Sequence, residues 1–180
     1  MASLLAAGAR PPLRATAPPR NGAPLLPGMM PQGTCVALPF GRMTAGMLRS
    51  LAVAPLRLTP WRSVLVEARI PPADCWILDP TDPRLRVAAC PGRSGCASAT
   101  VETRSLALRL AGRVPPGASL HVSGCAKGCA HPAPAHFTLT GRAGRFDLIR
   151  QGTAGDVPAL PDLHPDDIPD LLRGPLATFL

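Results

Sequence analysis

The chain has 180 residues, a formal net charge of +8 and a hydrophobic fraction of 46%. This length allows one domain, or two small ones, with a real core, and the composition excludes wholesale disorder. Tyr is absent and Arg is scattered, so we expect no nucleic-acid partner. The sequence contains no apolar run near the ~20 residues of a membrane span, and we expect a cytoplasmic protein without membrane contact.

Residues 1–33 are rich in Ala, Pro, Arg and Leu, and their prolines break any helix, so we expect a disordered tail or linker. Residues 34–70 are the first predicted unit. Apolar patterning predicts a strand over 35–38, a helix over 45–53 capped by Thr44, and strands over 56–59 and 63–66. This succession predicts half of a ferredoxin-like layer.

Residues 71–155 are the second predicted unit. The sequence predicts a short apolar segment at 75–78, a strand at 85–89 and a helix at 98–110. A strand at 119–122 follows, and then a hairpin of residues 137–140 and 146–149 around a Gly-containing turn. Residues 156–180 form a C-terminal extension with a short helix at 168–172. The predicted fold class is α+β.

Four of the six cysteines form two close pairs, and each pair follows a predicted strand. The pairs are Cys90–Cys96, spaced C-x5-C, and Cys125–Cys129, spaced C-x3-C. Because the chain shows no secretion signal, a disulfide framework is not expected. Four thiolates that converge on one point bind zinc or a [4Fe–4S] cluster.

Zinc and four unrelated buried cysteines are the alternatives to a cluster. Structural zinc prefers tighter C-x2–4-C knuckles in both halves, whereas the five-residue gap suits the separate corners of a cubane. Glycines beside both pairs allow backbone amides to approach cluster sulfides. Cys35 and Cys75 lie in predicted strand or apolar segments and are interpreted as core cysteines.

The cysteine motif resembles that of the sulfite/nitrite reductase iron–sulfur family. The resemblance is carried by Cys90-x5-Cys96, the step Glu102-Thr103-Arg104, and Ser123-Gly-Cys-Ala-Lys-Gly-Cys129. Within that family, three stretches resemble the precorrin-3B synthase branch of aerobic cobalamin biosynthesis: Leu38-Pro-Phe-Gly-Arg42, Leu56-Arg-Leu-Thr-Pro-Trp-Arg62, and the run from Ser123 to Pro132. The resemblance covers residues 34–155 and only the C-terminal half of the family's duplicated architecture.

The resemblance implies a ferredoxin-like half over 34–70 and a [4Fe–4S] half-domain over 71–155. It implies an O2-dependent oxidoreductase that hydroxylates precorrin-3A at C20 and closes a γ-lactone. It further implies a non-haem iron, an NADH-linked electron donor and a chain that supplies the missing N-terminal half. The sequence identifies no catalytic residue. His121, His131 and His136 lie near the motif, but an exposed or core-bonded histidine is the simpler interpretation of each.

The resemblance offers an explanation for the basic net charge, because precorrins carry many carboxylates and Arg binds a carboxylate through two parallel hydrogen bonds. The predicted substrate-binding residues are Arg42, Arg57, Arg62 and Lys127. Solvated surface Arg is the alternative for each of them.

Two rival functions stay open at this stage. In a sirohaem-dependent sulfite or nitrite reductase, the Cys129 thiolate would bridge cluster and sirohaem, although sirohaem is the less expected cofactor. In a non-catalytic half-protein, the chain would bind a cluster or zinc and need a partner.

Overall fold

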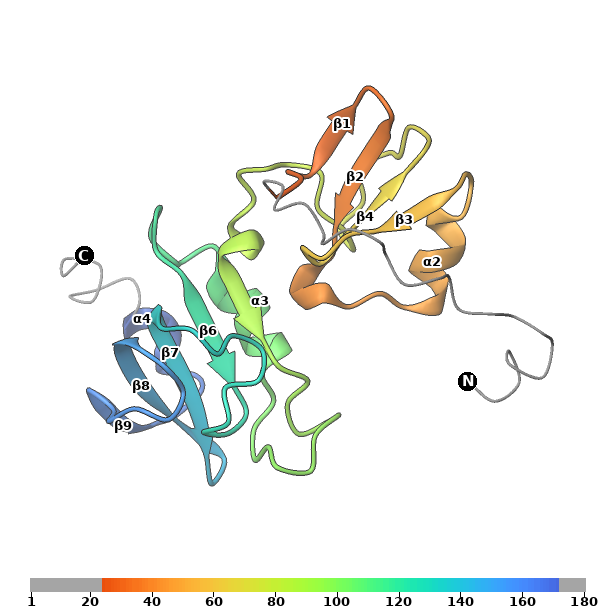
Figure 1. The fold of residues 1–180 in the computed structure, drawn as a ribbon. Helices are drawn as coiled ribbons and strands as arrows, with labels where there is room; N and C mark the ends of the chain where they lie inside the picture. Colours follow the sequence, from red (N-terminus) through yellow and green to blue (C-terminus); the bar gives the residue numbers. More distant parts are fainter. Residues whose placement is uncertain (1–23, 172–180) are drawn as a thin grey trace, which may run out of the picture.

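The computed structural model describes residues 24–171, which form two lobes, each built on its own sheet (Figure 1). The first lobe holds a four-stranded antiparallel sheet in the order β1-β2-β4-β3. Its strands are Gly28–Met30 (β1), Gly33–Ala37 (β2), Leu56–Leu58 (β3) and Ser63–Val66 (β4), and they are interrupted by a 3-10 turn, Pro39–Gly41 (η1), and helix Ala45–Leu51 (α2).

The second lobe holds a five-stranded mixed sheet in the order β5-β6-β7-β8-β9. The pairs β5·β6 and β6·β7 are parallel, and the pairs β7·β8 and β8·β9 are antiparallel. Its elements are the 3-10 turn Pro83–Arg86 (η2), Val87–Ala89 (β5), helix Arg104–Ala111 (α3), Leu120–Ser123 (β6), Ala135–Arg142 (β7), Arg145–Gly152 (β8), Leu160–Leu163 (β9) and the short helix Ile168–Leu171 (α4).

Each lobe has a separate apolar core. In the first lobe, Val36, Val64 and Val66 lie on one face of the sheet and pack with Leu51 of α2. This arrangement explains why α2 forms here, because Thr44 caps its start and Leu51 supplies its buried contact. In the second lobe, Leu106, Ala107, Leu110 and Ala111 of α3 join a core with residues of β5, β6, β7 and β8.

The α+β fold class is confirmed. The predicted strand–helix–strand–strand of the first lobe is present, and so is the hairpin of the second. Four elements differ from expectation. The strand predicted over 85–89 covers only Val87–Ala89, because Leu85 and Arg86 belong to the 3-10 turn η2. Residues 28–32, expected within a disordered tail, form β1 and its turn into β2. The expected extension contains β9. Helix α3 begins at Arg104, because residues 98–103 form an irregular segment. Residues 1–23 of the expected tail and 172–180 of the extension lie outside the described residues.

Candidate metal centre

The two cysteine pairs follow neighbouring parallel strands. Cys90 comes directly after β5, and Cys125 comes two residues after β6. The strands are in register at Ala89 and Val122, and the Cys90 amide donates to the Val122 carbonyl at 3.3 Å. Because parallel strands end at the same edge of a sheet, the first cysteine loop lies beside the start of the second.

One of the thiols, that of Cys90, accepts a hydrogen bond from a backbone amide. The Gly124 N–H donates to the Cys90 Sγ, with 3.1 Å between nitrogen and sulfur. Only glycine fits here, because an added Cβ would lie 2.5 Å from the Cβ of Ala99. Hydrogen bonds from backbone amides to sulfur tune cluster sites, so the donor chemistry around Cys90 fits an iron–sulfur cluster.

Thr103 anchors the first cysteine loop to the start of α3. Its side chain is fully buried and its hydroxyl donates to the Cys90 carbonyl at 2.6 Å. The loop passes so close that a Cβ on Gly92, whose φ is +72°, would lie 2.8 Å from the Thr103 Oγ1. The Thr of the acidic-Thr-basic step therefore holds the backbone of a cysteine.

Cys90 and Cys129 line one hollow of about 280 Å³, together with Phe40, Arg62 and four further residues: Ala89, Pro91, Arg104 and Ala130. Phe40 and Arg62 both have positive φ, of 56° and 57°. A left-handed backbone conformation costs a bulky residue about 1–3 kcal/mol, and residues in this conformation cluster at functional sites. The Arg62 Nη2 also donates to the Ala130 carbonyl at 2.7 Å, which ties the first lobe to the second cysteine loop.

Cys96 and Cys125 are half-buried and are not among the residues that line this hollow. Within residues 24–171, no three His, Cys, Asp or Glu side chains converge as ligands of one metal ion. A cubane spaces its ligands more widely than a single ion does, because each thiolate binds a separate iron. The set of Cys90, Cys96, Cys125 and Cys129 therefore stays a prediction.

The predicted substrate-binding residues lie in different surroundings. Arg42 lines a hollow of about 240 Å³ beside Phe40, and Arg62 lines the cysteine hollow. Arg57 is bonded to Glu67 on the first sheet, with 2.6 Å between Nε and Oε1. The Lys127 Nζ donates to the Ser98 Oγ at 3.0 Å, so it links the two cysteine loops.

Two of the three nearby histidines form a pair under the second cysteine loop. His121 of β6 is fully buried, its two ring nitrogens have no hydrogen-bond partner among the described residues, and its ring meets that of His131 edge-on at 5.8 Å. Burial, followed by repulsion from His131 and Arg62, lowers the pKa of His121 to about 4. His136 is bonded to Ser119.

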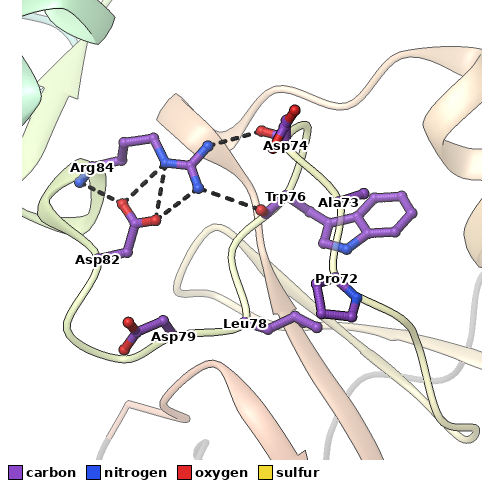
Figure 2. A pocket seen from close by; sticks show the side chains of 8 residues that line it. All are labelled: Pro72, Ala73, Asp74, Trp76, Leu78, Asp79, Asp82 and Arg84. Carbon is purple, nitrogen blue, oxygen red and sulfur yellow. Dashed lines mark hydrogen bonds and ion pairs between the residues drawn. The ribbon is translucent and has the colours of Figure 1, made fainter.

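A further hollow of about 480 Å³ lies in the loop from Pro72 to Arg84 (Figure 2). The Arg84 guanidinium binds both carboxylate oxygens of Asp82 and the carbonyls of Asp74 and Trp76. These bonds lower the pKa of Asp82 below its ordinary value. The donors of Arg84 are thus committed to shaping the loop between the lobes.

Three residues near the cysteine loops were not among the predicted site residues. Phe40 and Arg104 line the cysteine hollow, and Arg86 lines a neighbouring hollow that shares Arg62 with it. A signal was present for Arg104, since it is the basic residue of the acidic-Thr-basic step. Phe40 lies in the stretch Leu38–Arg42 that carries the resemblance, but only its packing against the core of the second lobe places it at the site. Arg86 carried no such signal; its guanidinium is bonded to the Val114 carbonyl.

Comparison with known proteins supports the resemblance found in the sequence. No family model matches the chain. A precorrin-3B synthase from Sinorhizobium sp is 43% identical over 82 residues, which is 43% of this chain and 18% of that protein. The structure of the Mycobacterium tuberculosis NirA protein superposes with a TM-score of 0.53 at 19% identity, over 84% of this chain and 38% of that one.

The chain resembles precorrin-3B synthase. Its fold is similar to that of the NirA protein, and this similarity concerns the fold alone. The chain spans about a fifth of the length of the curated relative that it matches. That relative is by name an enzyme of precorrin chemistry. None of the helices described between residues 24 and 171 has the length and apolar character needed to cross a membrane.

Proposed function

We propose that this chain is the cluster-binding half of a precorrin-3B synthase-like oxidoreductase. The observation that carries the proposal is the placement of Cys90 and Cys129 on one hollow, with the Gly124 amide bonded to the Cys90 sulfur. The likeness to precorrin-3B synthase supports the choice of reaction. Cys96 and Cys125 complete the proposed ligand set.

The proposed reaction is hydroxylation of precorrin-3A at C20 with closure of a γ-lactone, with dioxygen as oxidant. A [4Fe–4S] cluster, when bound, supplies one-electron transfer. The chain's own residues hold the site: Gly124 donates to sulfur, Thr103 fixes the Cys90 carbonyl, and Arg62 joins the lobes across the second cysteine loop. A non-haem iron and an NADH-linked donor belong to the same proposal, and no ligand is assigned to that iron.

The cysteine hollow favours one alternative, a sirohaem-dependent reductase, because Cys129 is exposed and faces the same hollow as Cys90. Extraction of the anaerobically purified protein with acidified acetone discriminates the two functions. A precorrin-3B synthase-like protein yields no sirohaem, whereas a sulfite or nitrite reductase yields sirohaem together with the cluster.

Turnover tests the enzyme itself. We expect conversion of precorrin-3A under oxygen when the chain is combined with a chain that supplies the N-terminal half of the family's architecture. Reduction of sulfite or nitrite by that combination, without conversion of precorrin-3A, would contradict the proposed reaction. A combination that holds a cluster but turns over none of these substrates would leave the non-catalytic half-protein as the better description.

A further inference from the structure

Three neighbouring hollows share side chains where the two lobes meet. The hollow beside Arg42 and the cysteine hollow have Phe40 and Arg104 in common. The cysteine hollow shares Arg62 with a third hollow of about 240 Å³, which is also lined by Arg86 and His131. We call this series the basic groove, defined by Arg42, Arg62, Arg86 and Arg104.

The cations of the basic groove have no acidic partners in the part of the chain that the structure describes. No ion pair there includes any of the four, whereas Arg57 and Arg84 are paired with Glu67 and Asp82. The hydrogen bonds of Arg62 and Arg86 go to backbone carbonyls, those of Ala130 and Val114.

Two of these guanidinium groups also have unused donors. The Nε atoms of Arg86 and Arg104 are buried and have no hydrogen-bond partner among the described residues. Leaving a buried donor of a charged group unpaired is costly, so such groups are expected to meet an anion. The hollow of Arg86 has no acidic residue in its lining, and the cysteine hollow has none either. The hollow of Arg42 is lined by one acidic residue, Asp74, whose carbonyl is bonded to Arg84.

Thiolates of a cluster would account for only part of this charge. Arg62 and Arg104 share their hollow with Cys90 and Cys129. The hollows of Arg42 and Arg86 contain none of the four predicted cysteine ligands. Cations on both sides of the cysteine hollow therefore suit a ligand with several separate anionic groups.

We propose that the basic groove binds several carboxylates of one rigid ligand, with Arg62, Arg86 and Arg104 as the contacts. A planar guanidinium binds a carboxylate through two parallel hydrogen bonds. Arg57 is not one of these contacts, because its guanidinium is bonded to Glu67. The inference rests on the proposed function, since a precorrin is such a ligand.

The test measures porphyrin binding to the full chain after anaerobic cluster reconstitution. The probe is uroporphyrin, which carries an acetate and a propionate on every pyrrole ring, and its affinity is followed by fluorescence. Coproporphyrin, in which methyl groups replace the acetates, has the same ring with fewer carboxylates. We expect uroporphyrin to bind more tightly, because the groove offers more than one cation.

The variants Arg62→Gln, Arg86→Gln and Arg104→Gln are each expected to weaken uroporphyrin binding by about tenfold or more. The matched control is Arg69→Gln, because Arg69 is exposed and lines none of these hollows. It is expected to change the affinity by less than about twofold. The circular dichroism spectrum and iron content of each variant show whether it folds and holds its cluster.

Wild-type affinity in the three variants would overturn the inference. Displacement of uroporphyrin by single-stranded DNA, with the same loss in each variant, would also overturn it and indicate nucleic acid as the ligand. If Arg86→Gln lost iron together with affinity, the groove would serve the cluster instead, which contradicts the inference. A wild-type chain that holds no iron but binds uroporphyrin through these Arg residues would sink the proposed function alone.

Discussion

The hydroxyl of Thr103 provides a sharp test of how the first cysteine loop is held. Thr103→Val keeps the shape of the side chain and removes the donor to the Cys90 carbonyl, an interaction of 2.6 Å between fully buried or nearly buried groups. A buried carbonyl left without its donor costs about 1–3 kcal/mol. For a chain of this size, that loss lowers the melting temperature by about 2–12 °C.

The assay is urea and thermal unfolding of the full chain, followed by circular dichroism. Thr103→Ser keeps the donor and is expected to retain most of the stability. Thr100→Val is the control in the same loop, because Thr100 is exposed and is expected to change stability by less than about 0.5 kcal/mol. If Thr103→Val unfolds with the same free energy as Thr100→Val, the anchoring argument is wrong.

Three further predictions concern the same region. His121 is fully buried with a pKa of about 4 in the folded protein and an ordinary value of 6.5, so the unfolded chain takes up the proton first as the pH falls. As the pH falls from 6.5 to about 4, the free energy of unfolding should drop by up to about 3 kcal/mol, and His121→Leu should remove this drop. The control is His164→Gln, because His164 is exposed. An unchanged drop in His121→Leu would show that another group is responsible. Gly141→Ala should cost about 1–3 kcal/mol by denaturant unfolding, because its Cβ would lie 2.2 Å from the Val101 Cγ2. Gly144→Ala, at φ +85° and with no heavy atom within 4 Å, should cost only about 1 kcal/mol, and a reversed order would contradict the packing. Lys127→Met removes an exposed hydrogen bond to Ser98 and should change the free energy of unfolding by less than about 1 kcal/mol. A larger loss of stability would show that this hydrogen bond holds the two cysteine loops together.

Local patterning predicted the elements whose apolar residues face a core. The strand at Ser63–Val66 and the β7–β8 hairpin were visible because apolar runs are bounded by Gly and Pro. β1 was missed because Gly28–Met30 has no apolar alternation and is stabilised by pairing with β2. β9 was missed because prolines surround it, and it pairs at only two positions across a register shift.

The start of α3 was misplaced for a tertiary reason. Residues 98–103 have a helical pattern, but the Thr100 amide donates to the Gly124 carbonyl and the Arg93 amide donates to the Val101 carbonyl. These bonds hold the segment in an irregular conformation against the second cysteine loop. Sequence spacing identified the cysteine pairs, whereas Phe40 reaches the cysteine hollow only because it packs against the core of the second lobe.

Iron and acid-labile sulfide per chain test the central claim most directly. The protein is purified without oxygen, beside Cys90→Ser and Cys129→Ser, with Cys75→Ser as control. The interpretation of Cys75 as a core cysteine was wrong, because Cys75 is exposed, and it lies outside the proposed ligand set. We expect about four iron and four sulfide per chain in the wild type and the control, and a loss in the other two variants. Zinc alone, no metal, or the same iron content in Cys90→Ser and Cys129→Ser would contradict a four-cysteine cluster site in this chain.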